Sequence, residues 1–160
     1  MNTDQYKQKI TPFLWFDKEA RQAAKFYTSI FPGSKIKGGD KFEDTPSGTV
    51  DVVSIELMGQ EFVLMSAGPQ FKFNESISFV VNCESQKEVD YYWEKLTSNG
   101  GQESMCGWLK DRFGVSWQVV PIQLNQMLGD KDPKKSGNVM QSMLKMKKII
   151  IADLEKAFNQ

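Results

Sequence analysis

Alternation between apolar and polar residues divides the first part of the chain into a strand, a helix and three more strands. The aromatic-rich run over residues 10–16 predicts a buried strand. Apolar residues then recur every three or four positions over 18–31, which predicts an amphipathic helix that Asp17 caps and Pro32-Gly33 ends. Further strands are expected over 34–42, 50–58 and 61–66, the last two joined by a Gly59-Gln60 turn.

The same order of elements recurs in the second part of the chain. A strand is predicted over 77–83 and a helix over 85–98, which Asn99-Gly100-Gly101 ends. Adding 66 to the residue numbers places like residues of the two helices on one another, such as Tyr27 on Trp93. Adding 55 does the same for the last strands, as with Phe62 and Trp117. These registers favour an internal repeat, with two unrelated βα units as the alternative.

After Pro121 the pattern becomes helical and rich in methionine and lysine. Asp132-Pro133 predicts a helix start, and Leu154, Ala157 and Phe158 mark a shorter last helix. The whole pattern predicts an α+β fold of two βαβββ modules with C-terminal helices. We expect a single domain over residues 1–160, with module one at about 10–66, module two at about 77–121 and a helical tail at about 122–160.

Charge and histidine content limit the chemistry that this chain offers. Lysine plus arginine (20) balance aspartate plus glutamate (20), so no overall field attracts nucleic acid or an anionic membrane. Residues 1–9 have no apolar signal-peptide core, and no long apolar run follows, which predicts a cytoplasmic protein. The count of 0 histidines disfavours zinc hydrolases, Ser-His triads and histidine-ligated iron. Cys83 and Cys106 are expected to be free thiols.

Three stretches of the chain carry a family resemblance: 10–17 (ITPFLWFD), 24–34 (AKFYTSIFPGS) and 107–121 (GWLKDRFGVSWQVVP). They resemble the PhnB-like branch of the glyoxalase/bleomycin-resistance superfamily, also called vicinal-oxygen-chelate proteins, over about residues 10–158. That branch often bears the label demethylubiquinone 3-methyltransferase. A doubly wound methyltransferase has a Gly-rich turn after its first strand, whereas Asp17-Lys18-Glu19-Ala20 follows here, so the sequence does not support the label.

The resemblance implies two modules whose curved sheets enclose a cavity, usually within a homodimer. It also implies metal-ligand positions at about Pro12, at Ser76 or Ser78, and at Gln118. Proline has no donor side chain, and neutral serine and glutamine oxygens supply little charge to a dication that must lose its water. We therefore expect no metal and no other cofactor.

Strand alternation then selects candidate ligand-binding residues. If Gln118 faces the cavity, Ser116 and Val120 do too, while Trp117 and Val119 face the helices; Trp15 is likewise assigned to the core. The candidates for ligand contact, by the same parity and by aromatic character, are Gln118, Phe16, Leu14, Met65, Ser78 and Trp108.

Each candidate has a purely structural alternative. Gln118 either orients a ligand or bonds internally across the sheet, and Trp108 and Phe16 either stack on a ligand or belong to the core. Cys106 lacks a histidine to activate it and is expected to be a buried structural thiol rather than a nucleophile. Glu103 and Asp111 are acids or bases, or simply solvent-facing charges. No catalytic residue is assigned.

Three classes of function compete at this point. The first is a metal-free small-molecule-binding protein with an apolar or aromatic ligand, as among the drug-sequestering members of the superfamily. The second is a metal-independent enzyme acting on a small carbonyl or aromatic metabolite, with Gln118 and serines polarising a carbonyl. The third is an interaction protein whose cavity is filled by side chains and whose dimer is the active unit.

Overall fold

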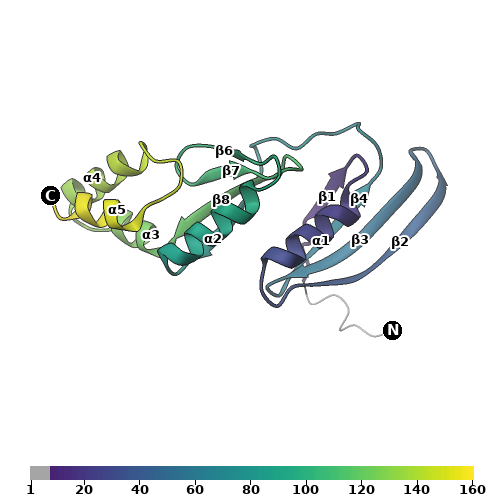
Figure 1. The fold of residues 1–160 in the computed structure, drawn as a ribbon, viewed down its shortest axis with the longest axis horizontal. Helices are drawn as coiled ribbons and strands as arrows, with labels where there is room; N and C mark the ends of the chain where they lie inside the picture. Colours follow the sequence, from purple (N-terminus) through teal and green to yellow (C-terminus); the bar gives the residue numbers. More distant parts are fainter. Residues whose placement is uncertain (1–7) are drawn as a thin grey trace. The chain divides into compact units, whose positions relative to one another are not determined.

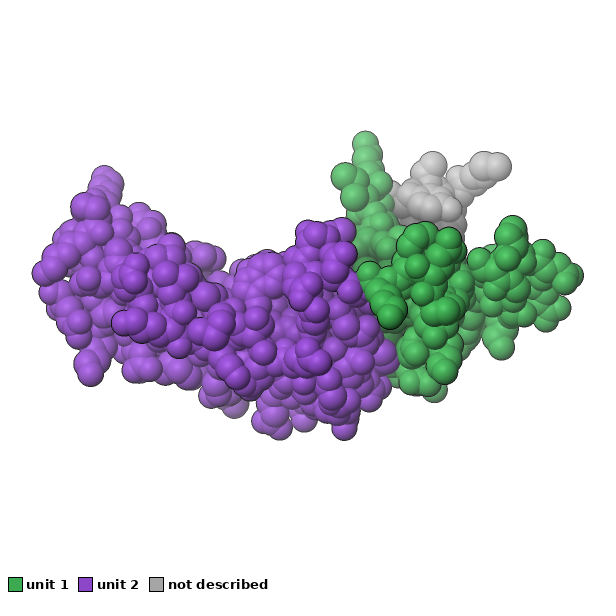
Figure 2. Space-filling view, turned by 90° about the horizontal axis from the view of Figure 1, so that it is seen from above, with its two compact units in different colours: residues 1–72 green, residues 73–160 purple. Residues whose placement is uncertain are grey.

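The computed structural model describes residues 8–160, which form two compact units (Figures 1 and 2). Unit 1 is Met1–Lys72 and unit 2 is Phe73–Gln160. Residues 1–7 lie outside the described residues. They include most of the segment 1–9, in which the sequence shows no signal-peptide pattern. Within residues 8–160, none of the helices has the length and apolar character needed to span a membrane.

Unit 1 is a four-stranded sheet with one helix on it. The chain runs through β1 (Phe13–Phe16), α1 (Ala20–Ile30), β2 (Lys35–Thr45), β3 (Gly48–Leu57) and β4 (Gln60–Ser66). The strands are ordered β1-β4-β3-β2, and β1 pairs with β4 in parallel while the other pairs are antiparallel. Helix α1 covers one face, where Tyr27, Ile55 and Leu64 are almost completely buried (Figure 1).

Unit 2 repeats this arrangement. It contains β5 (Phe79–Cys83), α2 (Gln86–Thr97), β6 (Gln102–Glu103), β7 (Trp108–Lys110) and β8 (Ser116–Pro121). The strand order β5-β8-β7-β6 matches that of unit 1, with the first and last strands again parallel. The predicted fold of two βαβββ modules is therefore confirmed, and the internal repeat with it.

The two modules differ by one residue in the connection between strand and helix. Three residues, 17–19, separate β1 from α1, whereas only Glu84 and Ser85 separate β5 from α2. The helices therefore match at a spacing of 66, but the first strands match at 67, so that Leu14 corresponds to Val81. A slip of one residue moves every side chain of a strand to the other face, and this decides which candidates reach the open face.

Two local predictions need correction. Asp17 does not cap α1: the N-cap is Glu19, which makes no side-chain cap, and the first helical N–H, on Ala20, donates to the Ser66 hydroxyl at 3.0 Å. The hairpin turn is Met58-Gly59, one residue earlier than predicted, because Leu57 pairs directly with Gln60. Both turn residues have positive φ, as this two-residue turn requires.

The tail adds three helices to unit 2: α3 (Ile122–Leu128), α4 (Pro133–Met143) and α5 (Ile151–Phe158). Asp132 caps α4 as predicted, accepting from the Lys134 N–H at 2.9 Å. The end of β8 lies in the same apolar cluster, because Val120 packs with these helices instead of facing a ligand cavity as predicted. The other buried members of this cluster are Leu124, Met127, Val139, Ile149 and Leu154.

Candidate functional site

Strand β8 has the two-sided character that the alternation predicts, apart from its end at Val120. Trp117 and Val119 are buried beneath α2, whereas Gln118 is half-buried on the opposite, open face. Gln118 is in register with Trp108 of β7, and its amide Nε2 donates to Ser78 Oγ at 2.9 Å. Gln118, Ser78 and Trp108 therefore lie together on the open face, and the internal bond foreseen as an alternative for Gln118 is present.

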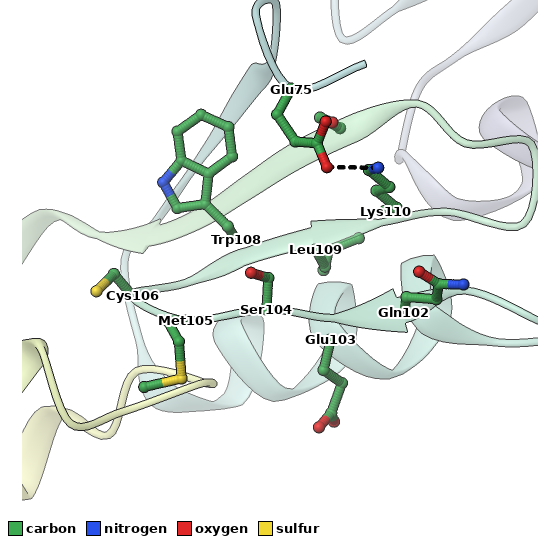
Figure 3. Close-up of a pocket in the computed structure, with 10 residues that line it drawn as sticks. Glu75, Gln102, Glu103, Ser104, Met105, Cys106, Trp108, Leu109 and Lys110 are labelled. Carbon is green, nitrogen blue, oxygen red and sulfur yellow. Dashed lines mark ion pairs between the residues drawn. The ribbon is translucent and has the colours of Figure 1, made fainter. Parts of the chain in front are cut away.

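A cavity of about 500 Å³ lies beside Trp108, entirely within unit 2, and its lining does not include Gln118 or Ser78 (Figure 3). This volume lies within the range of small-molecule pockets, roughly 300–1,000 Å³. Trp108 supplies its largest aromatic surface, and side chains of β6, β7 and β8 supply its polar groups. Its lining consists of Glu75, Gln102, Glu103, Ser104, Met105, Cys106, Trp108, Leu109, Lys110 and Ser116.

One ion pair lies at this cavity. The Lys110 ammonium is 2.5 Å from the Glu75 carboxylate, and Figure 3 shows the two side chains reaching toward each other beside Trp108. The hydrogen bond from Lys110 is the main cause that lowers the pKa of Glu75 below its ordinary value. The carboxylate stays ionised at neutral pH, and the pair is lost only as the pH falls through that lowered pKa.

A serine hydroxyl lies buried next to the ion pair. Ser116 is directly opposite Lys110 in the β7 and β8 ladder and is only 1% exposed. Within the described part of the chain, its Oγ has no hydrogen-bond partner. Leaving a buried hydroxyl unpaired costs about 1–3 kcal/mol, so this group favours a ligand or water that bonds to it.

The two carboxylates considered as acids or bases lie on the helix-covered side. Asp111 is 3% exposed, so the solvent-facing interpretation is wrong for it. Its Oδ1 accepts from the N–H groups of Phe113 and Val115, and its Oδ2 accepts from Trp117 Nε1 at 2.9 Å. Glu103 accepts from Trp93 Nε1 at 2.8 Å and points away from the ion pair in Figure 3. Both carboxylates thus hold neighbouring elements in place.

The two thiols differ in their surroundings. Both cysteines are free, as predicted. Cys83 is buried beneath α2, and burial raises the pKa of its thiol to about 12, so it carries no thiolate at neutral pH. Cys106 is half-buried, so it is not the buried thiol that was expected. It lies in a turn, with φ of 58°, and lines the cavity.

Two ligand-contact candidates of unit 1, Leu14 and Phe16, and the predicted core residue Trp15 have other positions than predicted. Leu14 and Phe16 are buried on the helix-covered face, since Phe16 pairs with Ser66, whose hydroxyl contacts α1. Their predicted orientation is wrong because of the longer connection after β1. Trp15 is not in the core but half-buried on the open face, where its Nε1 donates to Gly68 O at 2.8 Å. Met65 is paired with it there, as its parity predicts.

Lys110 and Glu75 are the charged residues of this cavity that the sequence reasoning missed. The signal for Lys110 was present, because it lies two residues after Trp108 and shares its face by strand alternation. Glu75 precedes β5 in an irregular segment, where alternation places no side chain. Only the folded geometry brings it to Lys110.

The residues at the metal-ligand positions implied by the superfamily do not fit a divalent cation. Pro12 offers no donor atom, and Gln118 and Ser78 are neutral and already bonded to each other. Among residues 8–160, no cluster of three or more histidine, cysteine or acidic side chains has metal-site geometry. Metal-assisted chemistry at these positions therefore has no support in the donor set.

Comparisons with known proteins bear on the family. The model of the 3-demethylubiquinone-9 3-methyltransferase family matches residues 8–120. The chain belongs to this family. The PhnB protein of Bacillus cereus, described as a putative 3-demethylubiquinone-9 3-methyltransferase, is 32% identical; the match covers 71% of this chain and 99% of that one, with a TM-score of 0.64. The comparison with curated proteins finds no match.

More distant structures share the fold of this family member. Protein PA1353 from Pseudomonas aeruginosa is 23% identical with a TM-score of 0.56, over 70% of this chain and 96% of that one. The fosfomycin resistance protein FosX from Listeria monocytogenes is 16% identical with a TM-score of 0.55, over 78% of this chain and 99% of that one. These likenesses show that the chain shares its fold with these proteins, as the resemblance to the glyoxalase/bleomycin-resistance superfamily implies. A FosX variant has been crystallised with Mn(II) and dihydroxypropylphosphonic acid.

The family name denotes a methyltransferase, but the chain lacks the features of the doubly wound class. The connection from β1 to α1 contains no glycine, and each sheet is a mixed four-stranded one with a single parallel pair. A nucleotide-type cofactor of that class binds at a Gly-rich turn between strand and helix of a parallel sheet. Neither module provides such a turn.

Proposed function

We propose that this protein binds a small, largely aromatic molecule on the open face of its second sheet, without a metal ion. The observation that carries the proposal is the cavity of about 500 Å³ beside Trp108. An aromatic surface with a few convergent polar groups is typical of small-molecule sites. Gln118 and Ser78, half-buried on the same face, are the proposed orienting groups.

The binding role of the remaining candidates follows from their positions. Leu14 and Phe16 support the core beneath α1, so the proposal does not use them as ligand contacts. Met65 remains a separate candidate on the open face of the first sheet. The superfamily neighbour FosX supports the general proposal, since its crystallised variant holds a small phosphonic acid.

The wider proposal concerns the whole protein. We infer a cytoplasmic homodimer of one domain per chain, with modules at about 10–66 and 77–121 and a helical tail at about 122–160. Neither nucleic acid nor membrane is proposed as a partner, because the charges balance. Exposed apolar side chains at the end of α4, those of Met140 and of the C-cap residue Leu144, support contact with a second copy.

A thermal-shift screen of metabolites and antibiotics, followed by native mass spectrometry, tests the binding proposal. We expect at least one aromatic compound to raise the melting temperature and to appear as a one-to-one adduct per chain. Trp108→Ala should abolish that shift, whereas Phe42→Ala, an exposed aromatic deletion in unit 1, should leave it unchanged. The proposal is contradicted if no compound in the screen of the full chain gives a thermal shift that Trp108→Ala removes. A stoichiometric metal ion in the adduct contradicts binding without a metal.

A further inference from the structure

The polar groups of the cavity differ in how firmly the fold holds them. Lys110 and Ser116 stand opposite each other on paired strands, and the side chain of Lys110 is 32% exposed. The side chain of Glu75 is 63% exposed and belongs to a turn before β5. The two groups held on strands, Lys110 and Ser116, can therefore donate hydrogen bonds. The carboxylate of Glu75 comes from the more exposed turn.

The present partner of Lys110 indicates the chemistry that the position accepts. Its ammonium already holds a carboxylate, that of Glu75. Ion pairs between exposed side chains contribute little to stability, so an incoming carboxylate exchanges with Glu75 at little cost. Ser116 adjoins Lys110 and offers an unpartnered hydroxyl as a second donor.

The other carboxylate of the cavity does not oppose an anion there. Glu103 points away from the ion pair and is bonded to Trp93 Nε1, and its second oxygen is 3.7 Å from the Lys147 ammonium. Its charge is thus directed to the opposite side of the sheet. Trp108, the residue nearest to Lys110 on the same face of β7, offers an indole surface to a planar ring.

We propose that the ligand of this cavity is a planar aromatic carboxylate, whose ring lies on Trp108 and whose carboxylate replaces that of Glu75 at Lys110 and Ser116. This inference rests on the proposed binding function and adds the ligand's charge class to it. Glu75 then acts as an internal placeholder, which keeps the Lys110 ammonium paired until a ligand arrives. No covalent step is involved.

Isothermal titration of the full chain with three isosteric probes tests the charge class. The probes are 2-naphthoate, the neutral 2-naphthamide and the cation 2-naphthylmethylammonium. We expect the naphthoate to bind about tenfold more tightly than the amide, the factor that one charge-assisted hydrogen bond provides. The cation should bind most weakly, because it meets the Lys110 ammonium.

Four variants assign that preference to the named residues. Glu75→Gln should tighten naphthoate about two- to fivefold, since the competing ion pair is gone, and leave the amide unchanged. Lys110→Gln should remove the preference for naphthoate, and Lys110→Arg should retain it. Ser116→Ala should weaken naphthoate about two- to tenfold without lowering the melting temperature, because its hydroxyl has no partner to lose. Lys87→Gln, an exposed change on α2, is the matched control.

The outcomes separate this inference from the function on which it rests. If naphthoate and naphthamide bind equally and Trp108→Ala weakens both, the inference of an anionic ligand is overturned and the proposed binding function stands. Tightest binding of the cation, lost in Glu75→Gln, overturns the inference and makes Glu75 the recognition residue. Absence of binding by all three probes also overturns it, and the metabolite screen then decides on the binding function by itself.

Discussion

Asp111 is the single residue on which the loop between β7 and β8 depends most. Its buried carboxylate accepts from two backbone N–H groups of that loop and from the indole of Trp117. We expect Asp111→Ala to lower the free energy of unfolding by about 3 kcal/mol or more, because three donors, two of them buried, lose their acceptor. Urea denaturation measures this change.

Two matched variants separate charge from shape at Asp111. Asp111→Asn keeps one acceptor oxygen and should therefore destabilise less than the alanine variant. Glu94→Gln, which neutralises an exposed carboxylate on α2, should leave the denaturation midpoint unchanged. If the three variants unfold at the same urea concentration, the hydrogen bonds of Asp111 contribute nothing and the loop is held by packing alone.

Adjacent residues on β8 should differ sharply in their effect on stability. Trp117 is 3% exposed, and its ring is 5.3 Å from that of Phe79 between centroids. Trp117→Ala should therefore cost about 3–5 kcal/mol, as large aromatic deletions in cores do. Gln118→Ala should cost far less, about 1 kcal/mol, because it removes one half-buried hydrogen bond to Ser78.

Denaturant midpoints of the two variants, with the affinity for any ligand found by screening, provide the comparison. Ser78→Ala removes the same hydrogen bond from the other side and is the control for Gln118→Ala. A loss of affinity in Gln118→Ala but not in Ser78→Ala assigns ligand contact to the glutamine. Unfolding of Gln118→Ala as readily as Trp117→Ala makes it a structural crosslink instead.

At the scale of elements, several side chains connect the tail to the second module, and one of them bonds to the tail backbone at two points. Gln86, the first residue of α2, donates from Nε2 to Ile149 O at 3.1 Å and accepts from the Ile151 N–H at 2.8 Å. The amide thus pairs with the tail backbone through both its nitrogen and its oxygen, at the start of α5. The turn at Cys106-Gly107 bonds to the same connection, at Met146 O and Lys147 O.

Gln86→Ala should loosen this connection without unfolding the sheet. We expect the loss of two hydrogen bonds to cost about 1–3 kcal/mol and to speed amide hydrogen exchange in residues 146–158 more than in β8. Lys87→Ala, at the next and exposed position of α2, is the control. Faster exchange spread evenly over unit 2 would show that Gln86 stabilises the module as a whole and does not specifically hold the tail.

The elements also show how far the sequence reasoning reaches. Helical spacing located α1 and α2, and alternation assigned both faces of β8 correctly up to Val120. The same reasoning failed for Leu14 and Phe16, because it carried the helix register across a connection that is one residue longer in the first module. The hydrophobic period and the strand propensity of a segment are local properties. The length of the connection before the helix changes which face a residue is assigned to when the helix register is extended to the strand, and it alters neither property.

The site was less accessible to prediction than the fold. Trp108, Gln118 and Ser78 could be placed on the open face because they lie on regular strands or directly beside one, and their contact with a ligand stays a prediction. The partnership of Glu75 with Lys110 joins residues 35 positions apart, one of them in an irregular segment. Likewise, the capping of α1 by Ser66 is a contact between the start of a helix and the end of a distant strand. Such contacts depend on the assembled module and leave no local signal.

At the scale of the whole molecule, the proposed homodimer rests on apolar surface that unit 2 does not use internally. Met140 and Leu144 are 39% and 48% exposed, and they lie one helical turn apart on the same side of α4. Val139 and Met143, their neighbours in sequence, pack inward on the cluster formed with α3 and α5. The tail therefore has one apolar side that stabilises its own module and another that remains available to a second copy.

Sedimentation velocity across micromolar concentrations tests this assembly. We expect a species of twice the 18.2 kDa chain mass, and Met140→Lys with Leu144→Lys should shift it toward the single chain, because two charges then oppose each other across a symmetric interface. The double variant should retain its melting temperature, since both side chains are exposed; Lys145→Gln is the control on the adjacent surface. A persistent 18.2 kDa species of the unaltered chain at rising concentration contradicts the dimer. If the double variant remains a dimer, the interface does not involve this side of α4. The long exposed strand β2 is then the next surface to alter.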